Sequence, residues 1–426
     1  MKFTRVFAFM ALAGLAGSAY ATNGYFSHGY GMKAKGMAGA ATASSDDAFG
    51  GANNPASMAF AGNRLDLGAD LFSPRREASR TGLGPFDGSV DSDSKYFLIP
   101  EFGYTRQMNS NLALGVTVYG NGGMNTNYPG GQIAAGNCGA TAANLLCGNG
   151  KLGVNLVQLI VAPTAAYKIA PNHSLGISPL IGYQRFKADG LQAFSGASSD
   201  PANLTNRGTD DSFGYGVRIG YMGKISPTVT IGAAYASKMK FDEVSKYQGL
   251  FAEQGGFDIP ENYNLGVAWQ ATPAVKLALD YQRISYSDVN SINNPSTNAF
   301  IPAPLGADNG PGFGWDDIDV WKLGVEYKYS QQLTLRAGYN HGDNPIQARD
   351  VTFNILAPGV VKDHATLGFT YTLASGNELT MSYMHAFKHD VSGTSILPAF
   401  MMNPPAGTEK IEMYQNSLGI QYSWKM

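Results

Sequence analysis

From Asn63 onward the sequence repeats one pattern, in which apolar and polar residues alternate over short segments. Between Val320 and Tyr329 every second residue is apolar or aromatic, and the residues between them are mostly polar or glycine. The same alternation occurs in residues 213–221, 229–235, 263–269, 275–281, 333–339, 365–373 and 418–424. A period of two places neighbouring side chains on opposite faces of a β-strand. The pattern therefore predicts an all-β chain whose strands each have one apolar face.

Connection lengths distinguish a membrane barrel from a soluble sandwich, whose strands would also alternate. We expect fourteen strands, starting near Asn63, Lys95, Asn111, Gly153, His173, Ser212, Thr228, Asn262, Ala274, Asp317, Gln332, Val361, Asn377 and Glu412. Short connections, such as Ser330–Gln331, alternate strictly with long ones, such as Ser73–Ser94, Val289–Asp316 and His389–Ile411. Short turns on one rim, long loops on the other and an even strand count are typical of outer-membrane barrels. The sequence thus predicts a 14-stranded antiparallel transmembrane β-barrel.

The N-terminus predicts export from the cytoplasm. Met1–Ala21 combine a basic start, an uncharged run and an Ala-Tyr-Ala cleavage site, which is the pattern of a signal peptide. No later apolar run approaches the roughly 18 residues that a membrane helix requires. Sparse charge and abundant Gly, Tyr and Phe favour the barrel, and a net charge of −2 gives no electrostatic reason to expect nucleic acid as a partner.

Six charged residues at mid-strand positions all fall on one parity. On the lipid face near the midplane, a Lys or Arg costs roughly 2–4 kcal/mol. The six residues lie on the strand face opposite to the aromatic residues, and they are Arg218, Lys276, Asp280, Lys322, Glu326 and Arg336. We therefore expect these side chains to face the lumen.

A segment of small residues precedes the first strand. Ala41–Phe60 is Gly-rich and has no period, and Pro55 restricts both its own backbone and that of Asn54, which predicts a turn. Small residues can fold within a narrow lumen, so we expect residues 22–62 to form a plug, or hatch, inside a barrel of residues 63–426. A flexible lead-in to the first strand is the alternative.

Two cysteines, Cys138 and Cys147, lie in one Gly/Asn/Ala segment. In an oxidising compartment, without a nearby His or third Cys, they favour a disulfide over a metal site. So small a ring would stabilise by about 2.5–3 kcal/mol at most. The disulfide is expected to hold a loop and not the fold.

Taken together, several short motifs resemble those of the FadL-type long-chain fatty acid and hydrocarbon transporters of the Gram-negative outer membrane. The resemblance covers nearly the whole mature chain. Its parts, in order, are Gly36-Met-Ala-Gly-Ala, Ser45-Asp46-Asp47-Ala48, Asn54-Pro55-Ala56, Ile259-Pro260-Glu261, Arg336-Ala-Gly-Tyr339, Asp343-Asn344-Pro345 and Ser382-Tyr-Met-His385. The resemblance implies a fourteen-stranded barrel with an N-terminal hatch, apolar binding sites, passive transport and lateral exit through a kink in the third strand.

Residue roles follow from that resemblance. Asp46, Asp47 and Asn54-Pro55-Ala56 match the hatch signature. The kink would fall at Gly120, Gly122 and Gly123, which tolerate unusual backbone angles. An outer capture groove would lie between residues 188–211 and 244–261, whose apolar residues are Leu191, Phe194, Leu204, Leu250, Phe251 and Phe257. For each of these, simple loop packing is the alternative to ligand contact.

The sequence departs from the family pattern in two places. A basic residue ahead of the tenth strand would grip a carboxylate, but this chain has Trp315-Asp316-Asp317 there. Three lumen-facing cations could replace it, or the ligand is uncharged: Arg218, Lys322 and Arg336. The chain also ends Trp424-Lys-Met426 rather than with a terminal aromatic, so Trp424 is a candidate for the barrel-assembly signal.

Other chemistries have weaker support. The histidines are candidates for a general base, and Asp390 could orient His385 or His389, but no nucleophile motif such as G-x-S-x-G accompanies them. The aspartates lack the spacing of a calcium loop. We expect no enzyme activity, metal or cofactor, and a monomer that contacts lipid, lipopolysaccharide and the barrel-assembly machinery. A general diffusion porin is the rival function, although its N-terminus should begin directly with a strand.

Overall fold

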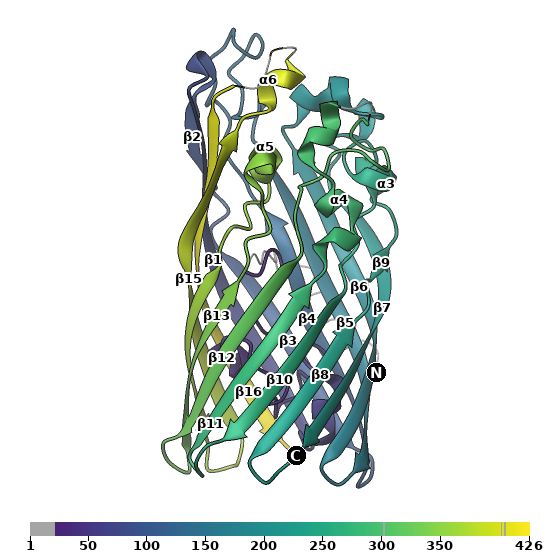
Figure 1. The fold of residues 1–426 in the computed structure, drawn as a ribbon, viewed down its shortest axis with the longest axis vertical. Coiled ribbons are helices and arrows are strands. Elements are labelled where there is room, and N and C mark those ends of the chain that lie inside the picture. Colours follow the sequence, from purple (N-terminus) through teal and green to yellow (C-terminus); the bar gives the residue numbers. More distant parts are fainter. Residues whose placement is uncertain (1–21, 301–302, 402, 404–405) are drawn as a thin grey trace.

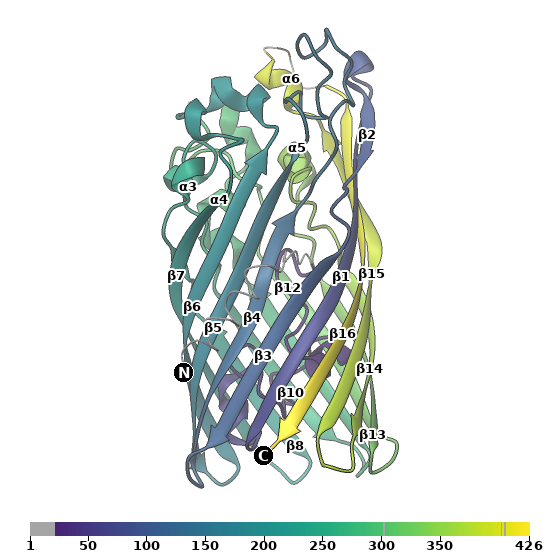
Figure 2. The ribbon, with the colours of Figure 1, turned by 180° about the vertical axis from the view of Figure 1, so that it is seen from behind.

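The strands join into one closed antiparallel barrel (Figures 1 and 2). The computed structural model describes residues 22–300, 303–401, 403 and 406–426, and the predicted signal peptide, residues 1–21, lies outside them. The last strand pairs with the first, with Arg64 opposite Lys425 and Thr81 opposite Thr408. Within the described chain, two short strands extend the sheet at its outer end and the other fourteen form the ring. The prediction of a 14-stranded barrel is confirmed.

The ring strands follow chain order. They are β1 (Arg64–Thr81), β3 (Phe97–Gln107), β4 (Leu112–Asn125), β5 (Gly153–Ala170), β6 (His173–Asp189), β7 (Asp210–Lys224), β8 (Val229–Ala236), β10 (Asn262–Gln270), β11 (Val275–Ile284), β12 (Ile318–Lys328), β13 (Leu333–Gly342), β14 (Asp363–Thr372), β15 (Glu378–Thr394) and β16 (Thr408–Lys425). The short strands are β2 (Gly88–Asp91), which pairs with β1, and β9 (Lys240–Phe241), which pairs with β7.

Helices are short and lie in the hatch and the long loops. The α-helices are α2 (Met32–Gly36), α3 (Ala252–Gly255), α4 (Asn290–Asn293), α5 (Val351–Asn354) and α6 (Leu397–Phe400). The 3-10 helices are η1 (Pro55–Ala59), η2 (Gly84–Phe86), η3 (Gln192–Ala197), η4 (Pro201–Asn203), η5 (Ser245–Tyr247), η6 (Tyr286–Asp288), η7 (Ser296–Phe300) and η8 (Ala348–Asp350). Among the described residues, no helix has the length and apolar character that a membrane span requires.

The two faces of the wall differ as the alternation predicts. In β12, Trp321 and Leu323 are about half exposed on the outside, whereas Lys322 and Glu326 are buried inside. Short turns lie at one end of the barrel and the helical loops gather at the other (Figure 1). Because apolar side chains gain by contact with lipid and charges do not, this distribution matches a membrane-spanning wall.

Several strands extend further into the long loops than the sequence indicates. The segment after Ser73 was expected to be a loop, yet β1 continues to Thr81. Likewise β15 continues to Thr394 and β16 begins at Thr408. The longer strands raise one side of the barrel above the rest (Figure 2). There, β1 places further side chains inside the lumen.

Candidate functional site

The hatch fills the lumen and consists of two parts that contact different walls. We call residues 31–62 the hatch body and residues 22–28 the hatch tip. In the body, Lys35 lies at the centre of a buried ion cluster, with its Nζ 2.8 Å from Asp70 and 2.5 Å from Glu101. Both carboxylates belong to the wall, so this cluster joins the body to β1 and β3.

A second ionic cluster holds the body near the short-turn end. Glu378 of β15 is 2.9 Å from the Nζ of Lys33 and 3.2 Å from the guanidinium of Arg64. Arg64 also binds Asp66, whose Oδ2 accepts the backbone N–H of Ala48 at 2.8 Å. The body is therefore attached to the wall through charged groups at several points.

The predicted hatch motif has well-defined contacts. The Asn54 side chain donates to the backbone oxygens of Thr42 and Tyr221 and accepts from the N–H of Ala56, and thereby caps η1. Pro55 starts that helix, as its fixed φ allows. The carboxylate of Asp46 pairs with Lys33, and that of Asp47 accepts from the N–H of Phe49.

The three lumen cations singled out from the sequence all contact the hatch or its immediate support. Arg218 donates to the backbone oxygens of Gly51 and Ala52, and Lys322 donates to that of His28. Arg218 and Lys322 line one small polar cavity beside the hatch. Arg336 pairs with Glu326 at 2.7 Å and donates to Thr370. None of the three lines the apolar pocket described below.

The hatch tip has mainly apolar and neutral contacts. The ring of Tyr25 lies near those of Tyr286 and Trp315, at centroid distances of 5.6 and 6.1 Å. The Tyr286 hydroxyl donates to the backbone oxygen of Asn23 at 2.6 Å and accepts the N–H of Tyr25 at 3.2 Å. Within the described chain, the side-chain polar atoms of Asn23 and both ring nitrogens of His28 are buried and have no hydrogen-bond partner.

The tip rests on an irregularity in β4, which is the third strand of the ring. Opposite β5, Gly120 pairs with Leu159 and Gly122 with Gln158, so Asn121 is one extra residue, a β-bulge. The backbone oxygen of Asn121 accepts the N–H of Ser27, and a Cβ at Gly122 would lie 1.8 Å from the oxygen of Tyr25. Glycine at 122 therefore permits the close approach of tip and wall.

The bulge coincides with a break in the wall. The ladder between β3 and β4, both wholly described, runs only from Gln107 opposite Ala113 to Phe102 opposite Val118. Beyond Val118, residues 119–124 are buried at every position, so the alternation is lost and this part of β4 bends inward. The chains meet again where the N–H of Asp93 donates to Asn127. The stretch between these two contacts is called the wall gap below.

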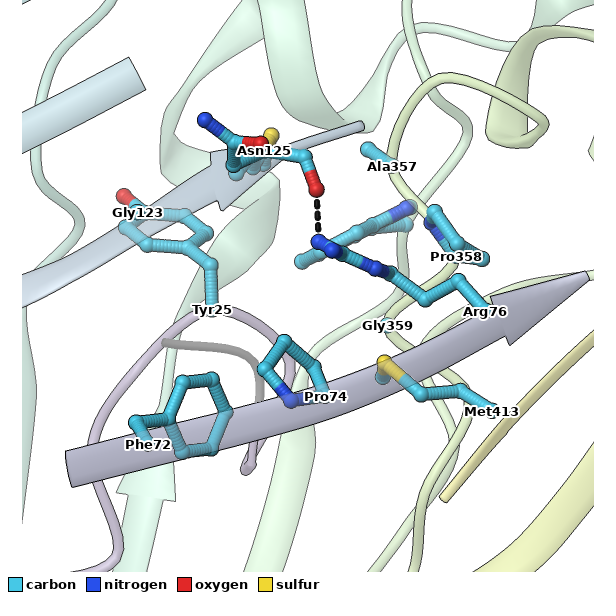
Figure 3. Close-up of a pocket in the computed structure, with 12 residues that line it drawn as sticks. Tyr25, Phe72, Pro74, Arg76, Gly123, Asn125, Ala357, Pro358, Gly359 and Met413 are labelled. Carbon is cyan, nitrogen blue, oxygen red and sulfur yellow. Dashed lines mark hydrogen bonds between the residues drawn. The ribbon is translucent and has the colours of Figure 1, made fainter. Parts of the chain in front are cut away.

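A pocket lies between the tip and the upper part of the wall gap (Figure 3). Its lining is Tyr25, Phe72, Pro74, Arg76, Gly123, Met124, Asn125, Trp315, Ala357, Pro358, Gly359 and Met413. We call it the inner pocket. Its free volume of about 20 Å³ holds about one water molecule, so a larger ligand has to displace side chains.

A second apolar pocket lies among the outer loops. Four of the six predicted groove residues line it, namely Leu191, Phe194, Leu250 and Phe251, together with Leu146, Leu305, Phe313, Phe353 and Leu356 from other loops. Leu204 is buried nearby in the same apolar cluster. Phe257 bridges outer loop and tip, because its ring is 4.9 Å from that of Phe251 and 6.3 Å from that of Tyr25.

The loops around this outer pocket are fixed by polar contacts. Trp315 donates from Nε1 to Asn354 at 2.6 Å, and Asp350 accepts from the backbone and hydroxyl of Ser296. Burial raises the pKa of the Asp350 carboxyl above its usual range. Cys138 and Cys147 form a disulfide with their Cα atoms 5.3 Å apart. Within the part of the chain that the structure describes, no group of three or more His, Cys, Asp or Glu could hold a metal ion.

Comparison with known proteins places the chain in a family. The profile of the outer membrane protein transport proteins (OMPP1/FadL/TodX) matches residues 10–396. The chain belongs to this family. It is accordingly an outer-membrane protein, and the expected family and localisation are confirmed. The search of curated proteins found no match.

Solved structures share the fold at low sequence identity. The toluene transporter TodX of P. putida is 18% identical with a TM-score of 0.69, and a FadL homologue of Pseudomonas aeruginosa is 14% identical with a TM-score of 0.69. The toluene transporter TbuX of Ralstonia pickettii is 16% identical with a TM-score of 0.64. Each comparison covers 94% of this chain and 99% of the other.

Sequence reasoning missed most of the inner pocket. Arg76 falls in a segment that was expected to be a loop, and Trp315 was noted only as a departure from the family pattern. A signal for Arg76 did exist, because residues 72, 74, 76, 78 and 80 continue the inward parity of β1. Tyr25, Met124 and Met413 come from three separate regions and meet only in the folded chain.

Proposed function

We propose that this protein takes up hydrophobic molecules, long-chain fatty acids or related hydrocarbons, passively across the outer membrane. The outer pocket captures the ligand, the hatch tip moves aside, and the ligand passes the inner pocket and leaves sideways through the wall gap. The observation that carries this proposal is the coincidence of the wall gap, the bulge at Asn121 and the tip at one place. Related proteins named as toluene transporters with the same fold are consistent with hydrophobic ligands.

Two separate pockets suit transport better than one tight site. Full burial of an apolar chain is worth about 0.8 kcal/mol per methylene, so a long chain fully buried at one site would be released slowly. The outer pocket has a free volume of about 40 Å³ and the inner one about 20 Å³. Both must open to admit a ligand, and partial burial at each step keeps the release fast.

The rival function, a general diffusion porin, needs an open aqueous lumen. Here the hatch body occupies the lumen and is attached through buried ion pairs, such as Lys35 with Asp70. We therefore favour the plugged transporter, for which little steady ion conductance is expected.

A pair of cross-linked variants tests the role of the tip. Asn23→Cys with Gly342→Cys joins the tip to β13, because the Oδ1 of Asn23 lies 3.3 Å from a Cβ at position 342. Joined by a disulfide or a short bis-thiol reagent, this variant is expected to lose most uptake and to regain it on reduction. Normal uptake by the cross-linked tip would refute the gating step.

The control joins the hatch body instead. Gly36→Cys with Arg336→Cys places two Cβ atoms 3.5 Å apart, within the range of disulfides. If only the tip moves, uptake by the oxidised and the reduced form of this variant should be equal. The reduced form also reports any effect of losing Arg336.

A further inference from the structure

Arg76 differs from every other buried cation that the structure describes. Most of the buried Lys and Arg side chains form ion pairs, but Arg76, Arg218 and Lys322 have no carboxylate of a described residue within 4 Å. Arg218 and Lys322 face the polar hatch. Arg76 is 6% exposed and lines the inner pocket, whose other side chains are largely apolar. A buried guanidinium in such surroundings requires an anionic or strongly accepting partner.

The guanidinium of Arg76 also spans the upper edge of the wall gap. Its two terminal nitrogens donate to the backbone oxygen of Asn125, on β4, and to that of Ser94, in the segment leading into β3 (Figure 3 shows the contact with Asn125). One side chain of β1 thereby connects the two chain segments that border the gap. These contacts use neutral carbonyl oxygens, which a carboxylate can replace with stronger, charge-assisted bonds.

Unused hydrogen-bonding capacity is concentrated at the same place. The Nε of Arg76, the Oδ1 of Asn125 and the hydroxyl of Tyr128 are all buried and have no hydrogen-bond partner among the residues that the structure describes. Arg76 and Met413 also line a second cavity of about 340 Å³, whose other lining residues are Arg75, Glu77, Asp91, Ser92, Lys95, Glu412 and Tyr414. The guanidinium thus stands between the inner pocket and an open space beside the wall.

We propose that Arg76 is the head-group receptor of the inner pocket and makes the protein prefer long-chain carboxylates over uncharged hydrocarbons. The carboxylate binds the guanidinium, while the apolar tail packs against Phe72, Met124 and Met413. Binding draws the guanidinium away from Ser94 and Asn125 and so releases the upper edge of the wall gap. This inference rests on the proposed function, since it names the ligand class of the same pathway.

The test compares an acid with its own methyl ester. Each is used to displace a fluorescent fatty acid from the full-length protein in lipid nanodiscs. Arg76→Met is expected to weaken binding of the acid by about tenfold or more, as the loss of hydrogen bonds to a charged group implies, and to leave the ester unchanged. Arg75→Met is the matched control, because Arg75 is the preceding residue, does not line the inner pocket and donates to the exposed Tyr96. Arg76→Lys keeps the positive charge but loses the planar guanidinium, which can donate two parallel hydrogen bonds. Its affinity for the acid should therefore lie between those of the wild type and Arg76→Met.

The outcomes separate the inference from the proposed function. If Arg76→Met loses affinity for the acid but not for the ester, and Arg75→Met keeps its affinity for both, the head-group role is supported. Equal acid binding in the Arg75→Met and Arg76→Met variants overturns it, and so does an equal loss for acid and ester, which would mean a structural role. A wild type that binds the ester but not the acid overturns the inference and leaves hydrophobic uptake intact. A wild type that binds neither overturns both.

Discussion

The hatch body and the hatch tip lie in one lumen but are held by opposite kinds of contact. The body is fixed by buried ions, with Lys35 between Asp70 and Glu101 and Lys33 beside Glu378. The tip forms no ion pair among the described residues and is held by aromatic rings, by neutral hydrogen bonds and by one hydrogen bond from Lys322 to the backbone oxygen of His28. The side chains of Asn23 and His28 have no hydrogen-bond partner in the described part of the chain. A hydrophobic ligand can replace the aromatic contacts of the tip, but it cannot replace the ion pairs of the body.

That difference matters because the tip rests directly on the bulge of β4, where the N–H of Ser27 donates to the backbone oxygen of Asn121. Breaking a buried ion pair leaves an unpaired charge, which costs about 3–5 kcal/mol, whereas a neutral hydrogen bond contributes about 0.5–1.5 kcal/mol. In the proposed mechanism, the moving part is therefore the tip, whose contacts are the weaker set. We propose that the charged body keeps the lumen closed to ions while the tip opens the path for the ligand.

The largest expected effect comes from removing the central cation of the body. Lys35→Met leaves Asp70 and Glu101 buried side by side without their partner, so we expect the body to detach from the wall at a cost of about 3–5 kcal/mol. Single-channel recording in planar bilayers should then show a steady conductance that the wild type lacks. Lys224→Met, an exposed change at the short-turn mouth, is the control. If Lys35→Met shows no more steady conductance than the wild type, the ion cluster does not hold the body in place.

A smaller effect is expected at the tip. Tyr286→Phe removes the hydroxyl that bonds both Asn23 and Tyr25, a loss of about 1–3 kcal/mol for buried groups left without a partner. Amide hydrogen exchange should become faster in residues 23–28 and stay the same in the body, and ligand uptake should rise. Tyr281→Phe, which removes a hydroxyl bonded to Asp319 on the outer wall, is the control. Faster exchange throughout the hatch would erase the distinction between body and tip.

The sequence predicts the strands of the barrel wall better than the hatch and the pockets inside it, for a physical reason. Lipid requires an apolar face, so the alternation around Lys322 and Glu326 reveals which side chains point inward. Above the membrane that requirement ends, and the pattern weakens after Ser73 although β1 continues to Thr81. This is why Arg76 was hidden in an expected loop.

The contacts between the hatch and the wall could not be predicted from the sequence, for a different reason. Lys35 pairs with residues of two different strands, and no local pattern indicates which wall residue faces which hatch residue. The small residues around Asn54 did indicate a segment able to fit within a lumen. The run Gly120-Asn121-Gly122-Gly123, by contrast, did not by itself reveal that β3 and β4 part there, and only the family resemblance indicated a kink at this place.

The central claim is that the ligand leaves through the wall gap, and deleting Asn121 tests it most directly. Without the extra residue, β4 can pair regularly with its neighbours and the gap should close. The control deletes Lys388, at the bulge where β15 shifts register between Ala386 and His389. In cells that depend on this protein, we expect uptake without Asn121 to fall to the level of cells lacking the protein, while uptake without Lys388 stays normal. Normal uptake by a correctly folded variant without Asn121 would contradict the account.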